Sequence, residues 1–520
     1  MYLVYENKDQ TIDIYLNNKI IKKFYPNFNL DKSSNLLSEF NNLEDSNGKP
    51  LYTRWLHKGY YILPSIQERI YWDYFVGLVA YSEVLKFLED KDYKIKLPKY
   101  YVNGRLNRMR NLLHGRIPFF KRILYNLIGG FLRKRFKQKH SIILNDDGFN
   151  GFRFHNFKKE LLEIKSFHRV EILSFANMRR LFFDRSTLPL GKFSLKKSNQ
   201  VNKFKISDKL SKYISNKGFN ELIYALDSIC MDIIEESREL DRILDHKKLD
   251  MFLTYDQTET CNALLLSSKI NSTITIAYQH GPFSNYHSGW IAYGIDSDHC
   301  NLKPNKLIVW GEYWKNFLSK ISNKFSNLEI IVGAHLNKKI DYDDINFQTL
   351  KELNSPLKLL VPYEFLANNL DVSKYLEKFI NLNINITIKL RPQGDGDIDS
   401  DLYSYSQVVQ ENSNFIYDLS DSELRNFDAV ICTQSIFSVE MMRFNTSIWY
   451  LETSVPFLKN IADDGYAHLL NIDEVNSFKK QEDVYKYLKP KYNISDYKNI
   501  FSDITLNDQI KIIIGAMNND

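Results

Sequence analysis

The chain has 520 residues, which is enough for two or three domains, each with its own hydrophobic core. Its hydrophobic content of 44%, charged content of 25% and net charge of +6 are ordinary for this length, so bulk charge does not argue for nucleic acid. Four scattered cysteines without CxxC spacing argue against a zinc site or a disulfide framework and suit a reducing compartment. Because the chain begins with a charged segment and has no apolar run of about 18 residues, we expect a cytoplasmic protein without a secretory signal or transmembrane helix.

Two patterns stand out near the N-terminus. Met1–Leu16 alternates weakly between apolar and polar residues, which favours a β-hairpin, and Ser65–Glu89 has apolar residues at helical spacing, which predicts a helix. With the basic segment that follows, these patterns indicate a mostly helical extension at residues 1–139.

Residues 105–139 differ from the rest of the chain, because they carry many lysines and arginines and no Asp or Glu. Between these cations, Ile117–Leu132 is largely apolar. Such a segment can lie on an anionic membrane surface, where each cation contributes about 1 kcal/mol, or it can be the solvated basic face of a core helix. Both interpretations stay open. No aromatic platform or recognised motif accompanies the charge, so we expect no nucleic-acid partner.

From residue 140 onwards, strand-like and helix-like runs alternate. The first strands are predicted at His140–Leu144, Val170–Ser174, Met251–Tyr255, the run from Thr273 to Gln279, and Lys306–Gly311. Helices are predicted at Asn156–Ile164, Leu222–Leu244, Glu259–Lys269 and Glu312–Ile321. This alternation predicts a parallel sheet, which binds ligands beyond the carboxyl ends of its strands.

The second half repeats the alternation. Its strands are predicted at Leu328–Val332, Leu357–Pro362, Ile384–Leu390, Phe415–Tyr417, Ala429–Cys432 and Ser447–Leu451. The polar stretch Lys338–Asn354 carries no strand signal and separates the halves. We therefore predict an α/β fold in which two Rossmann-like domains, at residues 140–340 and 341–520, face one another across a cleft.

Polar residues follow the predicted strands of the first domain. Asp146-Asp147-Gly148 ends one strand, and adjacent carboxylates can leave one of the pair as a general base, although Asp-Gly also makes an ordinary turn. In Gln279-His280-Gly281, His280 could form a hydrogen bond to a phosphate or hydroxyl of a ligand, or it could be a structural residue whose hydrogen bonds are made within the protein. Asp256 and Glu259 could serve as a base or a hydroxyl ligand, and Glu259 also suits the first turn of a helix.

The second domain offers a cation and a Ser/Thr pair at equivalent places. Arg391 and Pro392 follow a strand, and arginine can bind phosphate with two parallel hydrogen bonds. Thr433, Gln434 and Ser435 lie between a strand and a helix, where free N–H groups favour an anion and Ser435 can also cap the helix. Glu440, within that helix, could reach a ribose hydroxyl or be solvated.

The sequence lacks the GxGxxG, Walker, HExxH and GxSxG motifs, so dehydrogenase, ATPase, zincin and serine-hydrolase activities lose their usual support. Instead, the chain over residues 140–465 resembles the GT-B glycosyltransferases of bacterial surface-polysaccharide synthesis. The resemblance is carried by the QHG that ends at Gly281, VWG at Val309–Gly311, IIVGAH at Ile330–His335, KLRP at Lys389–Pro392 and VICTQSIFSVE at Val430–Glu440.

Within that fold, the chain is most similar to enzymes that use CMP-activated nonulosonic acids such as sialic acid, or Kdo. Those enzymes have an acidic pair before glycine, a His-Pro at a strand end and paired serines at a helix start. Here Arg391 stands in place of that histidine, and Ser435 is the single serine after Thr433. Transferases of CDP-glycerol or UDP-sugars with this fold, and a non-catalytic scaffold of the same shape, are the alternatives.

The resemblance implies a metal-independent transferase without a cofactor, which takes a nucleotide sugar and a glycan or lipid-linked acceptor. It implies that Asp147 or Asp146 deprotonates the acceptor and that His280 stabilises developing charge. Arg391, Pro392, Thr433, Gln434, Ser435 and Glu440 would bind the nucleotide, and the remaining substrate contacts would come from Asp256, Glu259, Gln279 and Glu364. Residues 105–139 would hold the enzyme near a capsule or lipopolysaccharide acceptor at the inner face of the membrane.

Overall fold

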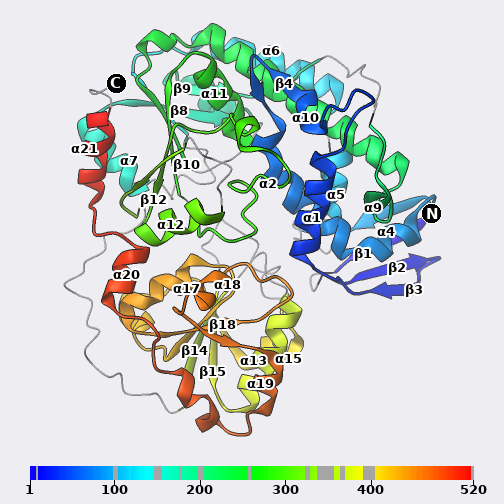
Figure 1. Ribbon diagram of the computed structural model, residues 1–520, viewed down its shortest axis with the longest axis vertical. Coiled ribbons are helices and arrows are strands. Elements are labelled where there is room, and N and C mark those ends of the chain that lie inside the picture. The colour runs from blue at the N-terminus through cyan, green and yellow to red at the C-terminus, as the bar shows by residue number, and fades with distance from the viewer. Residues whose placement is uncertain are drawn as a thin grey trace.

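The computed structural model shows two large parallel sheets flanked by helices and a smaller N-terminal sheet (Figure 1). It describes residues 1–7, 10–97, 104–115, 117–145, 155–174, 178–195, 204–255, 259–279, 281–321, 328–335, 356–363, 369–390 and 404–516. No helix in these ranges combines the length and apolar character needed to cross a membrane.

Seven strands form the first large sheet. They are β7 (Ile142–Leu144), β8 (Phe167–Ile172), β9 (Thr187–Leu190), β10 (Met251–Tyr255), β11 (Ile274–Tyr278), β12 (Lys306–Val309) and β13 (Glu329–Val332). Every neighbouring pair is parallel. The strands predicted from apolar, β-branched runs are confirmed because burial on both faces selects such residues. The edge strand β9, which contains Pro189, was not predicted.

Helices cover this sheet on both sides (Figure 1). They are α7 (His155–Ile164), α8 (Met178–Phe183), α10 (Asn216–Ile243), α11 (Glu259–Ile270) and α12 (Glu312–Ile321), with a short α9 (Asp208–Ser211) before α10.

Six parallel strands form the second large sheet. They are β14 (Lys358–Pro362), β15 (Asn385–Lys389), β16 (Ser413–Ile416), β17 (Ala429–Cys432), β18 (Ser447–Leu451) and β19 (His468–Leu470). The helices beside them include α13 (Asn369–Asn381), α15 (Gln407–Asn412), α16 (Asp421–Leu424), α17 (Ile436–Glu440), α18 (Lys459–Asp463) and α19 (Ile472–Ser477). The short strand β19 was not predicted.

Both sheets have the strand order of a Rossmann domain. In the order β13-β12-β11-β10-β7-β8-β9, the chain moves from β7 out to β9 and then returns to β10 on the other side of β7. In the order β16-β15-β14-β17-β18-β19, it moves from β14 to β16 and returns to β17 in the same way. Ligands of such sheets bind at the carboxyl ends of the strands where the order reverses. The predicted α/β fold with two Rossmann-like domains is confirmed.

The N-terminal region contains a sheet as well as helices. β1 (Tyr2–Glu6) and β2 (Ile12–Leu16) form the predicted hairpin, which β3 (Lys19–Phe24) and β6 (Tyr93–Lys96) complete in the order β3-β2-β1-β6. The helix predicted at Ser65–Glu89 is instead divided into several pieces. These are η2 (Leu63–Ile66), α2 (Gln67–Ile70), a π-helical turn η3 (Tyr71–Phe75), α3 (Val76–Ala80) and α4 (Ser82–Leu88).

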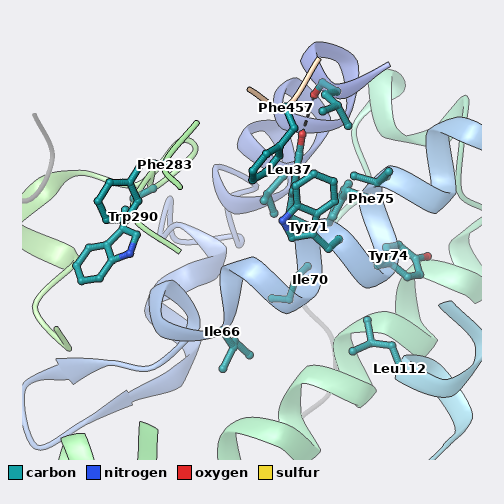
Figure 2. Packing of buried hydrophobic residues seen from close by; sticks show 14 of the residues in the cluster. Leu37, Ile66, Ile70, Tyr71, Tyr74, Phe75, Leu112, Phe283, Trp290 and Phe457 are labelled. Atoms are coloured by element: carbon teal, nitrogen blue, oxygen red, sulfur yellow. Dashed lines mark hydrogen bonds between the residues drawn. The ribbon is translucent and has the colours of Figure 1, made fainter. Parts of the chain in front are cut away.

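The other N-terminal elements are α1 (Leu30–Asn41), η1 (Leu51–Trp55), the small hairpin β4 (Leu56–His57) and β5 (Tyr60–Tyr61), α5 (Arg105–His114) and α6 (Phe119–Arg135). Among them, α6 contacts β9 of the first parallel sheet, α5 packs against α10, and α1 packs against η3 and α3. One hydrophobic core joins this region to both parallel sheets. Figure 2 shows part of it, with Tyr71 and Phe75 from η3, Phe283 and Trp290 from the loop after β11, and Phe457 from the second sheet's side.

The end of the chain returns to the first sheet. After α20 (Ile494–Ile500), α21 (Leu506–Ala516) lies beside α7 (Figure 1) and buries Ile510 and Ile513 against β7, β10 and β11. Gly311 permits this crossing, because a Cβ there would overlap the backbone carbonyls of Asn499 and Ile500. The final helices therefore complete the first domain's core. The boundaries predicted after residues 139 and 340 stay predictions, and the second lies outside the described residues.

Candidate functional site

Some of the predicted site residues follow the strands that flank the two places where the strand order reverses, and the others, such as Gln279 and Arg391, follow the neighbouring strands β11 and β15. The first reversal lies between β7 and β10, which are followed by Asp146-Asp147 and Asp256. The second lies between β14 and β17, which are followed by Glu364 and by Thr433–Ser435. Several of these residues lie outside the described ones: Asp146, Asp147, Asp256, His280, Glu364, Arg391 and Pro392. Glu259 begins α11, and its side chain is also outside them.

Asn145 joins the two strands at the first reversal. It is buried, its N–H donates to the carbonyl of Leu253 at 2.9 Å, and its side-chain amide donates to Thr254 Oγ1 at 3.4 Å and to Cys261 Sγ. These bonds connect β7, β10 and α11 immediately before the position of Asp146. Asn145 was not predicted as a site residue. Its place in the sequence directly before the acidic pair is the feature that could have indicated it.

Gln279 holds the loop that carries His280. It is fully buried, its Nε2 donates to the carbonyl of Gly281 at 2.9 Å, and its Oε1 accepts from the N–H of Trp310 at 3.0 Å. The side chain thereby ties the end of β11 to the end of β12. In the structure Gln279 has this positioning role, and its contact with substrate stays a prediction.

The N-terminal region supports the same loop from the other side. Tyr286 donates from its hydroxyl to Asp31 Oδ1 at 2.9 Å, and Asn41 Nδ2 donates to the carbonyl of Tyr293 at 2.7 Å. Burial lowers the pKa of His287 to about 4, so its ring is neutral at neutral pH and suits a structural position. The extension therefore contributes to the placement of the loop after His280.

The Ser/Thr pair follows β17 as predicted. Ser435 Oγ accepts from the N–H of Phe437 at 3.3 Å and caps α17. Thr433 is buried, and its carbonyl accepts from the N–H of Leu458 at 3.0 Å, which fixes the loop before α18. Gln434, between them, is half-buried.

A described cation lies beside this capped helix. Lys389, the last residue of β15, places its Nζ 5.1 Å from the ring centroid of Phe437 in the first turn of α17. Lys389 belongs to the KLRP motif, but only Arg391 and Pro392 of that motif were predicted as site residues. Its position brings positive charge to the carboxyl edge of the second sheet.

Glu440 connects the two domains. Its Oε1 lies 3.4 Å from Nε2 of His335, which follows β13 of the first sheet, and both side chains are largely buried. The His335 ring packs between Trp310 and Phe501, at centroid distances of 4.7 and 5.4 Å. His335 belongs to the IIVGAH run, which gave no hint of this pairing. Binding of ribose by Glu440 stays a prediction.

A second set of contacts joins the same two edges. Asn460 of α18 donates from Nδ2 to the hydroxyl of Tyr313 at 2.9 Å and to the carbonyl of Phe283 at 3.5 Å. Tyr313 in turn donates to Asp464 Oδ2 at 2.8 Å. Phe283 follows β11, and α18 follows β18, so both sets of contacts come from segments beyond strand carboxyl ends. The carboxyl edges of the two sheets therefore face one another.

A cavity of about 340 Å³ lies elsewhere, near the amino ends of β11 and β12. Its lining includes Tyr60, Lys269 and Lys303, and burial together with the charge of Lys303 lowers the pKa of Lys269 to about 8. None of the predicted site residues that the structure describes lines it.

No family model and no curated protein matches the sequence. Among solved structures, the calicheamicin glycosyltransferase CalG4 is 9% identical with a TM-score of 0.41, covering 73% of this chain and 99% of its own. MurG of Acinetobacter baumannii is 12% identical with a TM-score of 0.39, covering 74% and 100%. The UDP-GlcNAc 2-epimerase of Methanocaldococcus jannaschii is 15% identical with a TM-score of 0.39, covering 72% and 99%. Values this low carry no argument about activity or substrate.

Proposed function

We propose that this protein is a GT-B glycosyltransferase that moves a nonulosonic acid from a CMP-activated donor onto a bacterial surface glycan. The observation that carries the proposal is the pair of Rossmann sheets whose carboxyl edges face one another, with candidate residues after the strands on both sides of each reversal. A nucleotide at one edge and an acceptor at the other would meet between them.

In this proposal the second sheet binds the donor. Arg391 and Ser435 would hold the phosphate, Thr433 would assist, and Glu440 would bind ribose. Lys389, beside the first turn of α17, adds positive charge at the same edge. Fixed positive groups of this kind stabilise a departing phosphate without a metal ion.

The first sheet would bind the acceptor. Asp147 or Asp146 would take the proton of the attacking hydroxyl, and His280 would stabilise charge on the donor or leaving group. The bonds of Asn145 and Gln279 support this assignment, because they fix the chain immediately before Asp146 and His280. We also propose that residues 105–139 keep the enzyme near a lipid-linked acceptor at an anionic membrane surface.

Release of CMP from a CMP-nonulosonate tests the proposal. We expect the wild-type protein to release CMP, Asp147→Ala to abolish release, and Ser435→Ala to raise KM for the donor. Turnover of only a UDP- or CDP-linked donor would reassign the nucleotide. Failure to turn over any CMP-, UDP-, GDP- or CDP-linked donor would instead favour a non-catalytic scaffold of this shape.

A further inference from the structure

The basic segment at residues 105–139 is divided in the structure. α5 belongs to the N-terminal core, where Leu106, Met109 and Leu112 are buried. Arg105 is buried too and lies 5.1 Å from the ring centroid of Phe28. α5 is therefore ordinary core structure, and an outward-facing apolar surface must come from α6.

Two arginines attach the inner face of α6 to α10. Arg122 Nη1 donates to Asp232 Oδ1 at 2.9 Å, and Arg133 Nη2 lies 3.3 Å from both carboxylate oxygens of Glu236. Arg133 is buried. These two cations are thus held by carboxylates of the protein, and their spacing defines the side of α6 that faces inward.

The outer face of α6 is apolar. Phe120, Leu127 and Phe131 are 75%, 68% and 52% exposed, and they recur at the spacing that puts residues on one side of a helix. Phe119, at the start of the helix, is exposed as well. A folded protein gains nothing from holding several large apolar side chains in water, so this face calls for a covering partner.

α8 extends the apolar face beyond α6. Leu181 of α8 packs with Leu132 of α6 in a small core of their own, which holds the two helices together. Phe182 stacks on Phe131 at a centroid distance of 5.9 Å, and Phe183 beside it is 73% exposed. We call the surface formed by Phe119, Phe120, Leu127, Phe131, Phe182 and Phe183 the α6–α8 face.

Cations surround the α6–α8 face, and neither helix contains an acidic residue. Lys121, Lys134 and Arg179 are exposed, and the guanidinium of Arg135 lies 4.6 Å from the ring centroid of Phe182. Of the acidic residues nearest α8 in sequence, Glu171 pairs with Arg180, whereas Asp184 stays charged and accepts from the hydroxyls of Ser186 and Thr187, so the cations around the face outnumber a single nearby carboxylate.

We propose that the α6–α8 face docks on an anionic lipid surface, with its aromatic and aliphatic side chains at the acyl boundary and its cations among the headgroups. Apolar residues ringed by cations that form no ion pair with any described carboxylate match such a surface in both polarity and charge. The inference deepens the proposed membrane contact: it moves that contact from residues 105–139 as a whole to α6 and adds α8.

Co-sedimentation of the full chain with vesicles tests this inference. We expect binding to phosphatidylglycerol–phosphatidylcholine vesicles at low salt, weaker binding at 1 M salt, where the Debye length is about 3 Å, and little binding to phosphatidylcholine alone. The triple variant Phe120→Ser/Leu127→Ser/Phe131→Ser should bind roughly tenfold more weakly or worse. Ile20→Ser, which changes a 56%-exposed residue of β3, is the matched control and should bind as the wild type does.

Three results would overturn the inference. In the first, the wild-type protein stays in the supernatant with anionic vesicles. In the second, the triple variant binds vesicles as tightly as the wild type does. In the third, the wild type is a dimer that binds no vesicles and the triple variant is a monomer, which would assign the face to a second copy of the chain. A thermal melt checks that the variants fold. CMP release measured without vesicles keeps the outcomes separate, because it tests the proposed chemistry and does not require the α6–α8 face.

Discussion

Asp227 of α10 fixes the N-terminal region to the first parallel sheet. Its Oδ1 accepts from Arg54 Nε and from Trp55 Nε1, both at 2.9 Å, and its Oδ2 accepts from Arg54 Nη2 at 2.8 Å. Both charged side chains are only 7% exposed. We predict that Asp227→Asn, which preserves the shape and removes the charge, destabilises this region by about 3–5 kcal/mol, as expected when one partner of a buried ion pair is lost.

Amide hydrogen exchange is the suitable assay, because a chain with several domains need not unfold in one step. Peptides covering η1 and α10 should exchange faster by the factor that corresponds to the lost free energy. Glu239→Gln is the matched control on the same helix. Its pair with Arg242 spans 3.3 Å but leaves the arginine side chain 76% exposed, so the loss should be about 0–1 kcal/mol.

A double variant separates the charge effect from packing. Arg54→Met with Asp227→Leu replaces the pair by apolar groups and should recover part of the stability that Asp227→Asn loses. If Asp227→Asn and Glu239→Gln accelerate exchange equally, the buried pair does not hold the two regions together and the reasoning is wrong.

Three further predictions follow from the packing. Gly311→Ala should lower the thermal midpoint, because its Cβ would overlap α20 at a cost of about 1–3 kcal/mol in the free energy of unfolding. Gly130→Ala, whose Cβ would meet open space, should stabilise α6 by about 1 kcal/mol. Equal thermal midpoints of the two variants would contradict this prediction. Gln279→Leu should cost about 1–3 kcal/mol in chemical denaturation, because the buried Trp310 N–H loses its acceptor, and should also slow CMP release; unchanged stability would show that the loop is held by other contacts. Burial raises the pKa of Glu6 from 4.5 to about 7, so its contribution to stability is complete below pH 4.5 and is lost as pH rises through about 7. Relative to Glu6→Gln, the wild type should therefore lose about 3 kcal/mol over this window in urea titrations, and a constant difference between the two proteins would exclude the raised pKa.

The strands and helices whose apolar residues follow a single strong period could be predicted from the sequence. β10 is largely apolar and β11 is apolar and β-branched because helices cover both faces of their sheet, so their composition alone reveals them. β9 was missed because it contains Pro189, and a proline argues against a central strand although an edge strand such as β9 tolerates it. β19 was missed as well. The division of Ser65–Glu89 was also missed, because the apolar spacing continues through the π-helical turn at Tyr71–Phe75.

The candidate site was predictable as a set of strand ends but not as a set of contacts. Ser435 could be recognised as a helix cap, because that role depends on residues next to it in sequence. The pairing of Glu440 with His335 depends on how two domains meet, and no local pattern contains that information. The same reason hid the role of Gly311, whose neighbours Asn499 and Ile500 lie near the other end of the chain.

The return of α21 to the first sheet limits how this chain can be divided for expression. A fragment that stops between β13 and β14 would expose the apolar surface that Ile510 and Ile513 cover, and the complementary fragment would carry an amphipathic helix with no sheet to bind. The first Rossmann unit on its own would require the final helix to be supplied on a linker or as a separate peptide. A purification tag placed directly after α21 would sit beside α7 rather than on the second Rossmann unit.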